Sequence, residues 1–423
     1  MNAEVERSIA AVWRIESARI VAVVARMVRD VGLAEELAQD ALVSALEHWP
    51  KSGIPDNPGA WLTTTAKHAA LDRLRRDRLL QQKLEQIGLD LEAQEALVVP
   101  DFVDGLDARR TDVFQDDLLR LMFTACHPVL SLDARLALTL KLLGGLSTQE
   151  IARAFLVPEA TMAQRIVRAK RTLGEAGVPF ELPPPAELGE RLGAVLEAVY
   201  LIFNEGYTAT AGEDWMRPAL VDEALRLGRM LAELAPGEPE ALGLVALMEL
   251  QASRMGARLD AEGRPVLLLE QDRTRWDGVL LRRGLAALER AHGLGLAHGP
   301  YLLQAAIAAC HARARSAADT DWQAIAALYA ELAQVQPSPV VELNRAVAVG
   351  MADGPAAGLA LADRLAASGK LAGYHWLPSV RADLLSKLGR CEEARHEFDR
   401  AAAMTANGRE RELLLARARA QRS

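Results

Sequence analysis

Apolar side chains recur every three or four positions along most of the chain, which is the spacing of one face of an α-helix. Within residues 5–78 this spacing predicts three helices, the second over about 33–49 and the third over about 60–78. The same spacing returns over 118–173 and again from about residue 186 onward. The valine runs are short and mostly fall inside these helical patterns. We therefore predict an all-α fold.

Breaker-rich and acidic stretches divide the helical pattern. Prolines and glycines are dense over 50–59, and they cluster again over 174–189. Over 79–117 acidic residues far outnumber basic ones and the helical signal weakens. We predict a first helical domain over 1–78, an acidic linker over 79–117, a second helical domain over 118–173, a Pro/Gly linker over 174–189 and a helical-repeat extension over 190–423.

The predicted extension contains a weak internal repeat. Over 377–406, small residues and one phenylalanine stand at the spacing of a tetratricopeptide helix pair. These positions are Ala382, Ala394, Phe398 and Ala401. Looser copies of the pattern occur over 340–365 and 223–250. The pattern favours a tetratricopeptide-like repeat, and a generic helical bundle is the alternative.

Composition and charge narrow the class of protein. Half of the 423 residues are hydrophobic but only 4% are aromatic, which favours helices packed through Ala and Leu. A net charge of -8 argues against a protein that coats nucleic acid without specificity. Three widely spaced cysteines predict a reduced, intracellular chain. Because no signal segment or membrane-spanning run is present, we expect a cytoplasmic location and no membrane partner.

The sharpest motif lies at 146–171 and reads as two short helices joined by a tight turn. Ser147 is a candidate N-cap, and Glu150 stands three residues later, as in a capping box. The second helix is expected to bury Met162 and Ile166. Its opposite face presents Thr161, Gln164, Arg165, Arg168 and Arg171, with Lys170 alongside.

A second helix with a polar front and a basic flank is typical of a helix-turn-helix domain that enters the major groove of DNA. Arginine and lysine side chains also neutralise phosphates. An ordinary solvated helical hairpin would explain the charges alone. The capping box, the tight turn and the one-sided basic face occur together, and this combination favours DNA binding.

The first helical domain indicates which family of helix-turn-helix proteins the chain resembles. Residues 34–49, 58–62 and 66–76, followed by an acidic linker and a helix-turn-helix, resemble the extracytoplasmic-function (ECF) sigma factors. These belong to the sigma-70 family and keep its second and fourth conserved regions. The resemblance covers about residues 8–173. The extension resembles a subgroup that carries a fused tetratricopeptide-like domain, and residues 200–207 look like the segment that opens it.

The resemblance implies a sigma factor, which binds core RNA polymerase through the β′ clamp and the β flap and directs promoter-specific initiation without catalysis of its own. The implied polymerase-binding residues are Glu36, Gln39, Asp40 and Leu42. The residues implied at the −10 element, where a base leaves the stack, are Trp61, Lys67, His68, Arg73, Arg75 and Arg76. Those implied at the −35 element are Thr161, Gln164, Arg165, Arg168, Lys170 and Arg171. The acidic linker would follow the RNA-exit path.

Some residues depart from the family pattern or allow a plainer explanation. The family usually has Asn where this chain has His68, and Gly where it has Ala160. Trp49 and Trp61, at helical positions, also suit a hydrophobic core. Cys126 precedes a histidine but has no second ligand pair, so no metal is expected.

Two other classes of function remain open. A conventional helix-turn-helix regulator with a ligand- or protein-sensing repeat domain would not need polymerase, but it leaves 34–76 unexplained. An enzyme in the C-terminal half lacks a visible nucleophile–base pair or phosphate loop, although Asn204 and Glu205 are candidates, so we expect neither catalysis nor a cofactor. The net negative extension favours a protein partner, and we expect it to control the sigma half in cis.

Overall fold

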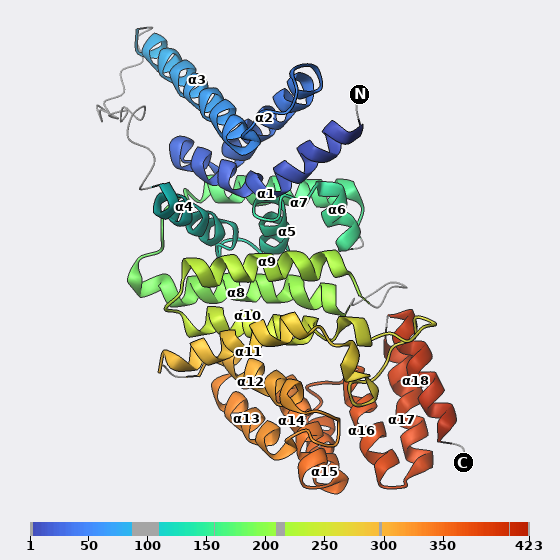
Figure 1. Ribbon diagram of the computed structural model, residues 1–423. Coiled ribbons are helices and arrows are strands. Elements are labelled where there is room, and N and C mark those ends of the chain that lie inside the picture. Colours follow the sequence, from blue (N-terminus) through green and yellow to red (C-terminus); the bar gives the residue numbers. More distant parts are fainter. Residues whose placement is uncertain are drawn as a thin grey trace. The chain divides into compact units, whose positions relative to one another are not determined.

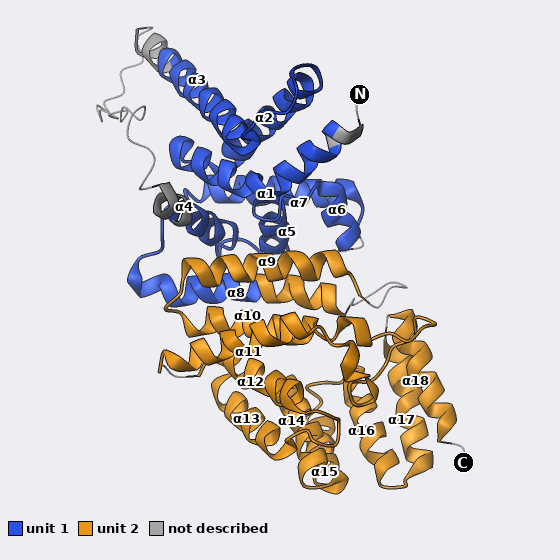
Figure 2. Cartoon of the chain, viewed as in Figure 1, with its two compact units in different colours: residues 1–198 blue, residues 199–423 orange. Residues whose placement is uncertain are grey.

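The computed structural model describes residues 3–86, 110–155, 157–208, 216–295, 298–405 and 407–421. Within these ranges the chain is helical and forms no β-strand, apart from one isolated bridge between Leu259 and Pro265 (Figure 1). The all-α prediction is confirmed. The chain divides into two compact units, residues 1–198 and 199–423, here called the N-terminal and C-terminal units (Figure 2).

Seven helices precede the long helix α8 in the described part of the N-terminal unit. They are α1 (Ala3–Val28), α2 (Val31–Ser52), α3 (Pro58–Gln86), α4 (Arg110–Ala125), α5 (Leu132–Leu142), α6 (Thr148–Ala154) and α7 (Glu159–Glu175). The first three pack on one another, and α5, α6 and α7 form a second group. Helix α3 continues beyond its predicted end at residue 78. Residues 87–109 of the expected acidic linker lie outside the described residues.

Helix α8 (Pro185–Tyr207) begins inside the stretch predicted as a Pro/Gly linker, and the boundary between the units falls within it. Proline is compatible with this start because the first helical position needs no backbone N–H. The first half of α8 packs in the N-terminal unit. There Arg191 donates to the Phe123 carbonyl over 2.9 Å, and Glu197 pairs with Arg135 over 3.4 Å.

The connection between α5 and α6 requires glycine. Gly145 has a φ of +63°, which a residue with a Cβ rarely adopts. A Cβ at this position would also lie 2.6 Å from the hydroxyl of Ser17 on α1. The turn that precedes the helix-turn-helix therefore packs closely against the first helix.

The described C-terminal unit continues as a succession of helices in which most pack on the next along the chain. They are α9 (Pro218–Leu234), α10 (Pro239–Ala252), α11 (Gly278–Gly293), α12 (Pro300–Arg313), α13 (Trp322–Val335), α14 (Pro339–Ala352), α15 (Pro355–Ala367), α16 (Trp376–Lys387), α17 (Cys391–Met404) and α18 (Gly408–Ala420). A pair of helices lies in each of the three stretches with the repeat pattern, 223–250, 340–365 and 377–406. In the α16–α17 pair, Ala382, Ala394 and Phe398 are fully buried.

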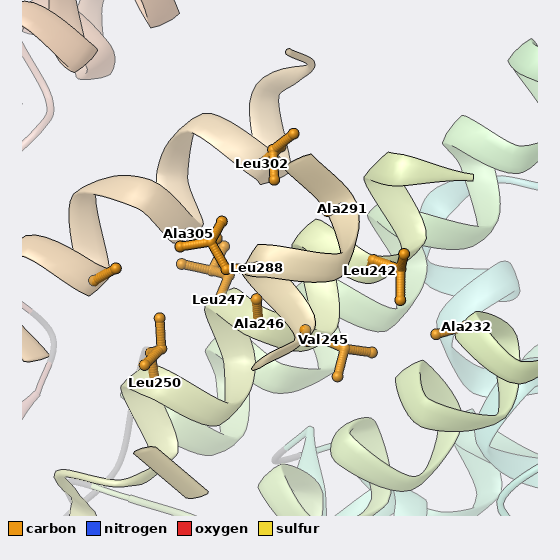
Figure 3. Packing of buried hydrophobic residues seen from close by; sticks show 12 residues of the cluster. Ala232, Leu242, Val245, Ala246, Leu247, Leu250, Leu288, Ala291, Leu302 and Ala305 are labelled. Carbon is orange, nitrogen blue, oxygen red and sulfur yellow. The ribbon is translucent and has the colours of Figure 1, made fainter. Parts of the chain in front are cut away.

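Small and branched side chains fill the core between α10, α11 and α12 (Figure 3). Ala246, Leu288 and Ala305 come from three different helices and meet there. Glycine brings two of the helices still closer, because a Cβ on Gly243 would lie 2.7 Å from the backbone nitrogen of Leu302. The low aromatic content of the chain thus corresponds to close packing between helices.

Between α10 and α11 the chain departs from α-helix over residues 253–277, here called the arginine segment. Three short 3-10 turns occur in it, Met255–Ala257, Leu268–Glu270 and Arg273–Arg275. Hydrogen bonds fix its course, among them Asp277 N to the Ser253 carbonyl at 2.8 Å. None of the described helices is both long and apolar enough to cross a membrane.

Candidate nucleic-acid interface

The helix-turn-helix motif begins with the predicted capping box. The Ser147 hydroxyl accepts a hydrogen bond from the Glu150 backbone N–H at 3.2 Å, and the Glu150 carboxylate accepts one from the Ser147 N–H at 2.7 Å. Both orphan donors at the start of α6 are thereby satisfied. Helix α7 follows Pro158 and buries Met162 and Ile166, as its periodicity predicts.

One face of α7 is exposed along its length. The predicted residues on this face are Thr161, Gln164, Arg168 and Arg171. Arg171 pairs with Glu175 over 2.6 Å one turn later, but both side chains are well exposed, so this pair is weak. Val167 lies on the same face with 60% of its side chain exposed and was not predicted. The face therefore combines polar, cationic and apolar groups, as base-edge recognition requires.

Two predicted basic residues of α7 point elsewhere. Arg165 pairs with Asp133 of α5 over 3.2 Å. Lys170 pairs with Glu35 of α2, its Nζ lying 2.7 Å from the Glu35 Oε2 atom. The basic side chains of α7 are therefore divided between an open face and contacts inside the N-terminal unit.

Glu35 joins the first helices to the helix-turn-helix. Its side chain is only 6% exposed, and it also pairs with Lys141 of α5 over 3.5 Å. The predicted polymerase-binding residue Gln39 donates over 2.6 Å to Glu35 Oε1, the same oxygen that Lys141 approaches. A buried carboxylate needs partners of this kind because removal from water is costly. Glu35 of α2 is thus paired with two ammonium groups, one from α5 and one from α7.

A second buried carboxylate makes a similar link. The side chain of Asp117 on α4 is fully buried between Arg26 of α1 at 3.2 Å and Arg120 at 3.0 Å. Burial raises the pKa of Asp117, and the two guanidinium groups act in the opposite direction. Helices α1 and α2 are thus tied to α4, α5 and α7 by two charged clusters.

Helix α3 carries the residues expected at the −10 element. Trp61 is half-buried and packs edge-on against Trp49, with 5.4 Å between ring centroids. Trp49 is buried, so it belongs to the core, while Trp61 is only partly covered. Lys67 is half-buried, and the exposed residues are His68, Arg73, Arg75 and Arg76. Arg73 pairs with Asp77, and Arg75 pairs with Asp72, in exposed pairs along the helix.

Helix α2 presents a separate exposed stripe. Glu36 and Asp40, both predicted, lie on it together with Val43 and Glu47, which were not predicted. Leu42 is half-buried beside the stripe. The Val43 side chain is 52% exposed. Spacings of four, three and four residues place these four side chains on one face, a signal that helical periodicity alone could have supplied.

The described residues offer no group of three or more side chains placed to hold a metal ion. Cys126 is buried, its sulfur 3.3 Å from the Thr139 hydroxyl, and burial raises the pKa of its thiol to about 11. Such a thiol stays protonated and unreactive near pH 7. Glu205 forms an ion pair with Arg217.

Comparisons with protein families match three stretches of the chain. Sigma-70 region 2 matches residues 14–79, and sigma-70 region 4 matches 120–173. The first stretch holds α2 and most of α3, and the second holds the helix-turn-helix. A family of unknown function, DUF6596, matches residues 191–292.

Several relatives are similar to the chain over different lengths. The uncharacterized protein R00370 of Rhizobium meliloti is 45% identical over 389 residues, which cover 91% of this chain and 89% of that protein. The probable ECF RNA polymerase sigma factor SigI of Mycobacterium tuberculosis is 27% identical over 42% of this chain and 58% of that protein. The ECF RNA polymerase sigma factor SigK of a Mycobacterium species is 34% identical over 24% and 53%, respectively. No solved structure matches the chain.

Proposed function

We propose that the chain, which matches sigma-70 regions 2 and 4 over residues 14–79 and 120–173, binds core RNA polymerase and directs promoter-specific initiation as an ECF sigma factor. One observation supports this most strongly. The open face of α7 occurs in the same compact unit as the exposed stripe of α2. A regulator that only binds DNA has no use for the second surface.

We assign the open face of α7 to the −35 element. Gln164 and Arg168 suit hydrogen bonds to base edges, and Val167 suits a thymine methyl group. The exposed part of α3 is assigned to the −10 element, together with the half-buried Trp61. The stripe Glu36, Asp40, Val43 and Glu47 on α2 is assigned to the polymerase clamp. Region 4 is expected to meet the flap.

The two DNA-reading parts have to separate for this function. By their names the promoter elements lie some 25 base pairs apart, which is roughly 85 Å of duplex. Glu35 and Lys170, by contrast, hold α2 and α7 in direct contact. We propose that the structure represents a closed form of the free protein and that polymerase binding opens it. Lys170 then becomes available for a DNA phosphate.

Binding to core enzyme tests the proposal directly. Purified full-length chain should co-elute with core RNA polymerase in gel filtration, and Asp40→Arg should weaken the complex at least tenfold by reversing a charge in the stripe. Glu190→Arg reverses an exposed charge of the same unit, on α8, and serves as the control. A chain that binds promoter DNA tightly but never associates with core enzyme would favour the helix-turn-helix regulator instead.

The C-terminal unit is proposed to control the sigma half in cis. It is net acidic and built of successive helix pairs, and such surfaces suit protein contacts better than DNA. Deletion of residues 208–423 tests this while keeping α8, whose first half packs in the N-terminal unit. Control in cis predicts a strong change in promoter output with core enzyme alone. Equal output from the two chains would mean that the unit acts only through a separate partner.

A further inference from the structure

A cavity in the C-terminal unit lies between the arginine segment and two helices near the end of the chain. Its volume is about 240 Å³. Three arginines line it, Arg254 and Arg258 of the arginine segment and Arg417 of α18, together with Tyr207 and Trp376. The space would hold a phosphate group or a small carboxylate with its waters, since one water occupies about 30 Å³ of liquid.

Arg254 differs from the other two arginines of the lining in the contacts of its side chain. Its guanidinium carbon lies 6.0 Å from the ring centroids of both Tyr207 and Trp276. Among the described residues its guanidinium group has no hydrogen-bond or ion-pair partner, and its Nε atom is buried. Because Arg254 is only half-buried and lines the cavity, its guanidinium group is placed to receive an acceptor from outside the chain.

The neighbouring cations are held in place by neutral groups. Arg258 is 8% exposed, donates to the Tyr207 carbonyl and the Thr208 hydroxyl, and lies 3.7 Å from the Tyr207 ring centroid. Arg273 donates to the carbonyl oxygens of His311 and Ala314. These contacts fix the orientation of the guanidinium groups but leave their charge in place.

Burial and the positive charges of Arg254 and Arg273 lower the pKa values of neighbouring titratable groups. Burial lowers the pKa of Arg258 and of Arg273, and the charge of Arg254 lowers both further. Burial likewise lowers the pKa of His311 to about 4, with Arg254 and Arg273 contributing. An anion seated beside Arg254 would relieve this mutual repulsion.

The lining also holds a carboxylate, but its contacts lie elsewhere. Glu410 accepts a hydrogen bond from the Thr405 hydroxyl and has the His375 ring nitrogen at 3.0 Å. Arg417 pairs with Asp383 over 2.5 Å. A further polar group in the lining, Gln271, donates from its Nε2 atom to the Val266 carbonyl over 3.3 Å.

We propose that this cavity binds a small organic anion, a phosphorylated or carboxylated metabolite, through the guanidinium of Arg254 with Arg258 beside it. Guanidinium groups bind both kinds of anion in a bidentate manner. The bound anion would connect the arginine segment to α16 and α18, which line the other side. This inference concerns the C-terminal unit and does not rest on the sigma-factor proposal.

Thermal unfolding of the full chain tests the proposal with inorganic phosphate and citrate as probes, against sodium chloride at equal ionic strength. At least one probe should raise the Tm saturably, by about 2–4 °C at saturation, because a ligand that binds only the folded state stabilises it. Arg254→Met should abolish the shift. Arg290→Met, at an exposed position on α11 outside the cavity, should keep it. A response to phosphate alone indicates a phosphoryl ligand, and a response to citrate alone indicates a carboxylate.

Hydrogen exchange on the unaltered chain gives a second readout in case Arg254→Met does not fold. The probe that raises the Tm should slow amide exchange in residues 253–277 and leave the amides of α13 unchanged. The proposal is overturned by the absence of any saturable shift, by an equal shift in Arg254→Met, or by protection that spares the arginine segment.

Discussion

The Nζ atom of Lys170 lies 2.7 Å from the Oε2 atom of Glu35, and this ion pair connects the recognition helix α7 to helix α2. Both side chains are largely buried, at 17% and 6% exposure. This pair joins region 4 to region 2. It occupies the ammonium group of Lys170, which we propose contacts a DNA phosphate once the two regions separate. In the proposed closed form, this ion pair holds α2 and α7 together.

Replacing Glu35 should destabilise this contact strongly. In Glu35→Gln, Lys141 and Lys170 would face each other with no carboxylate between them, and loss of one partner from a buried pair costs about 3–5 kcal/mol. Amide exchange in α5 and α7 should accelerate accordingly. Glu36→Gln, the exposed neighbour on the same helix, should change the exchange free energy by less than about 0.5 kcal/mol. Similar exchange in the two variants would contradict a role for Glu35 in holding the contact.

Residues on the open face of α7 should set sequence preference. Gln164→Ala and Arg168→Ala should each relax preference at −35 positions, at a cost of about 1–3 kcal/mol if the contact is bidentate. Arg165→Ala should do so less, because Asp133 holds that side chain. Lys170→Ala should weaken binding evenly across sequences and reduce its salt dependence.

Site selection from random DNA by the polymerase complex measures the preference. Arg19→Ala, on the exposed side of α1, is the control, and unchanged preference in both face variants would show that another face reads the DNA.

A positive charge at Val43 in the stripe on α2 should weaken polymerase binding, as Asp40→Arg does. Val43→Arg places a long cation at an exposed apolar position that we expect polymerase to cover, so affinity for core enzyme should fall at least tenfold. The fold should be unaffected, because the position is half exposed. Titration of labelled chain with core enzyme measures the affinity. An unchanged affinity alongside a weakened Asp40→Arg would confine the contact to the first turns of α2.

His311 should make the stability of the C-terminal unit depend on pH. Burial, with Arg254 and Arg273, lowers its pKa from 6.5 to about 4, so the unfolded chain binds the proton more tightly. The stabilisation is therefore full above pH 6.5 and is lost as the pH falls toward 4, by on the order of 3 kcal/mol. His311→Gln should flatten this part of the profile, measured as Tm between pH 4.5 and 7.5. His396→Gln, at an exposed position on α17, should leave the profile as it is.

Sequence periodicity accounted well for features that depend on neighbours along the chain. The capping box at Ser147 and the buried side of α7 follow from local spacing, and so do the helix pairs of the C-terminal unit. The Glu35–Lys170 pair joins residues that are 135 positions apart, so no local pattern could reveal it. The arginine segment could not be predicted because it has no helical period. Its arginines are brought together by the turns of the folded backbone.

Reconstituted transcription shows whether the chain acts as a sigma factor. Core RNA polymerase should be incubated with the purified full-length chain on a template that carries a promoter selected by the complex, and initiation should be measured by run-off transcript. A sigma factor should yield a specific transcript that core enzyme alone does not make and that Asp40→Arg and Arg168→Ala both reduce. A chain that binds the same DNA yet yields no transcript above core enzyme alone would contradict the proposed function.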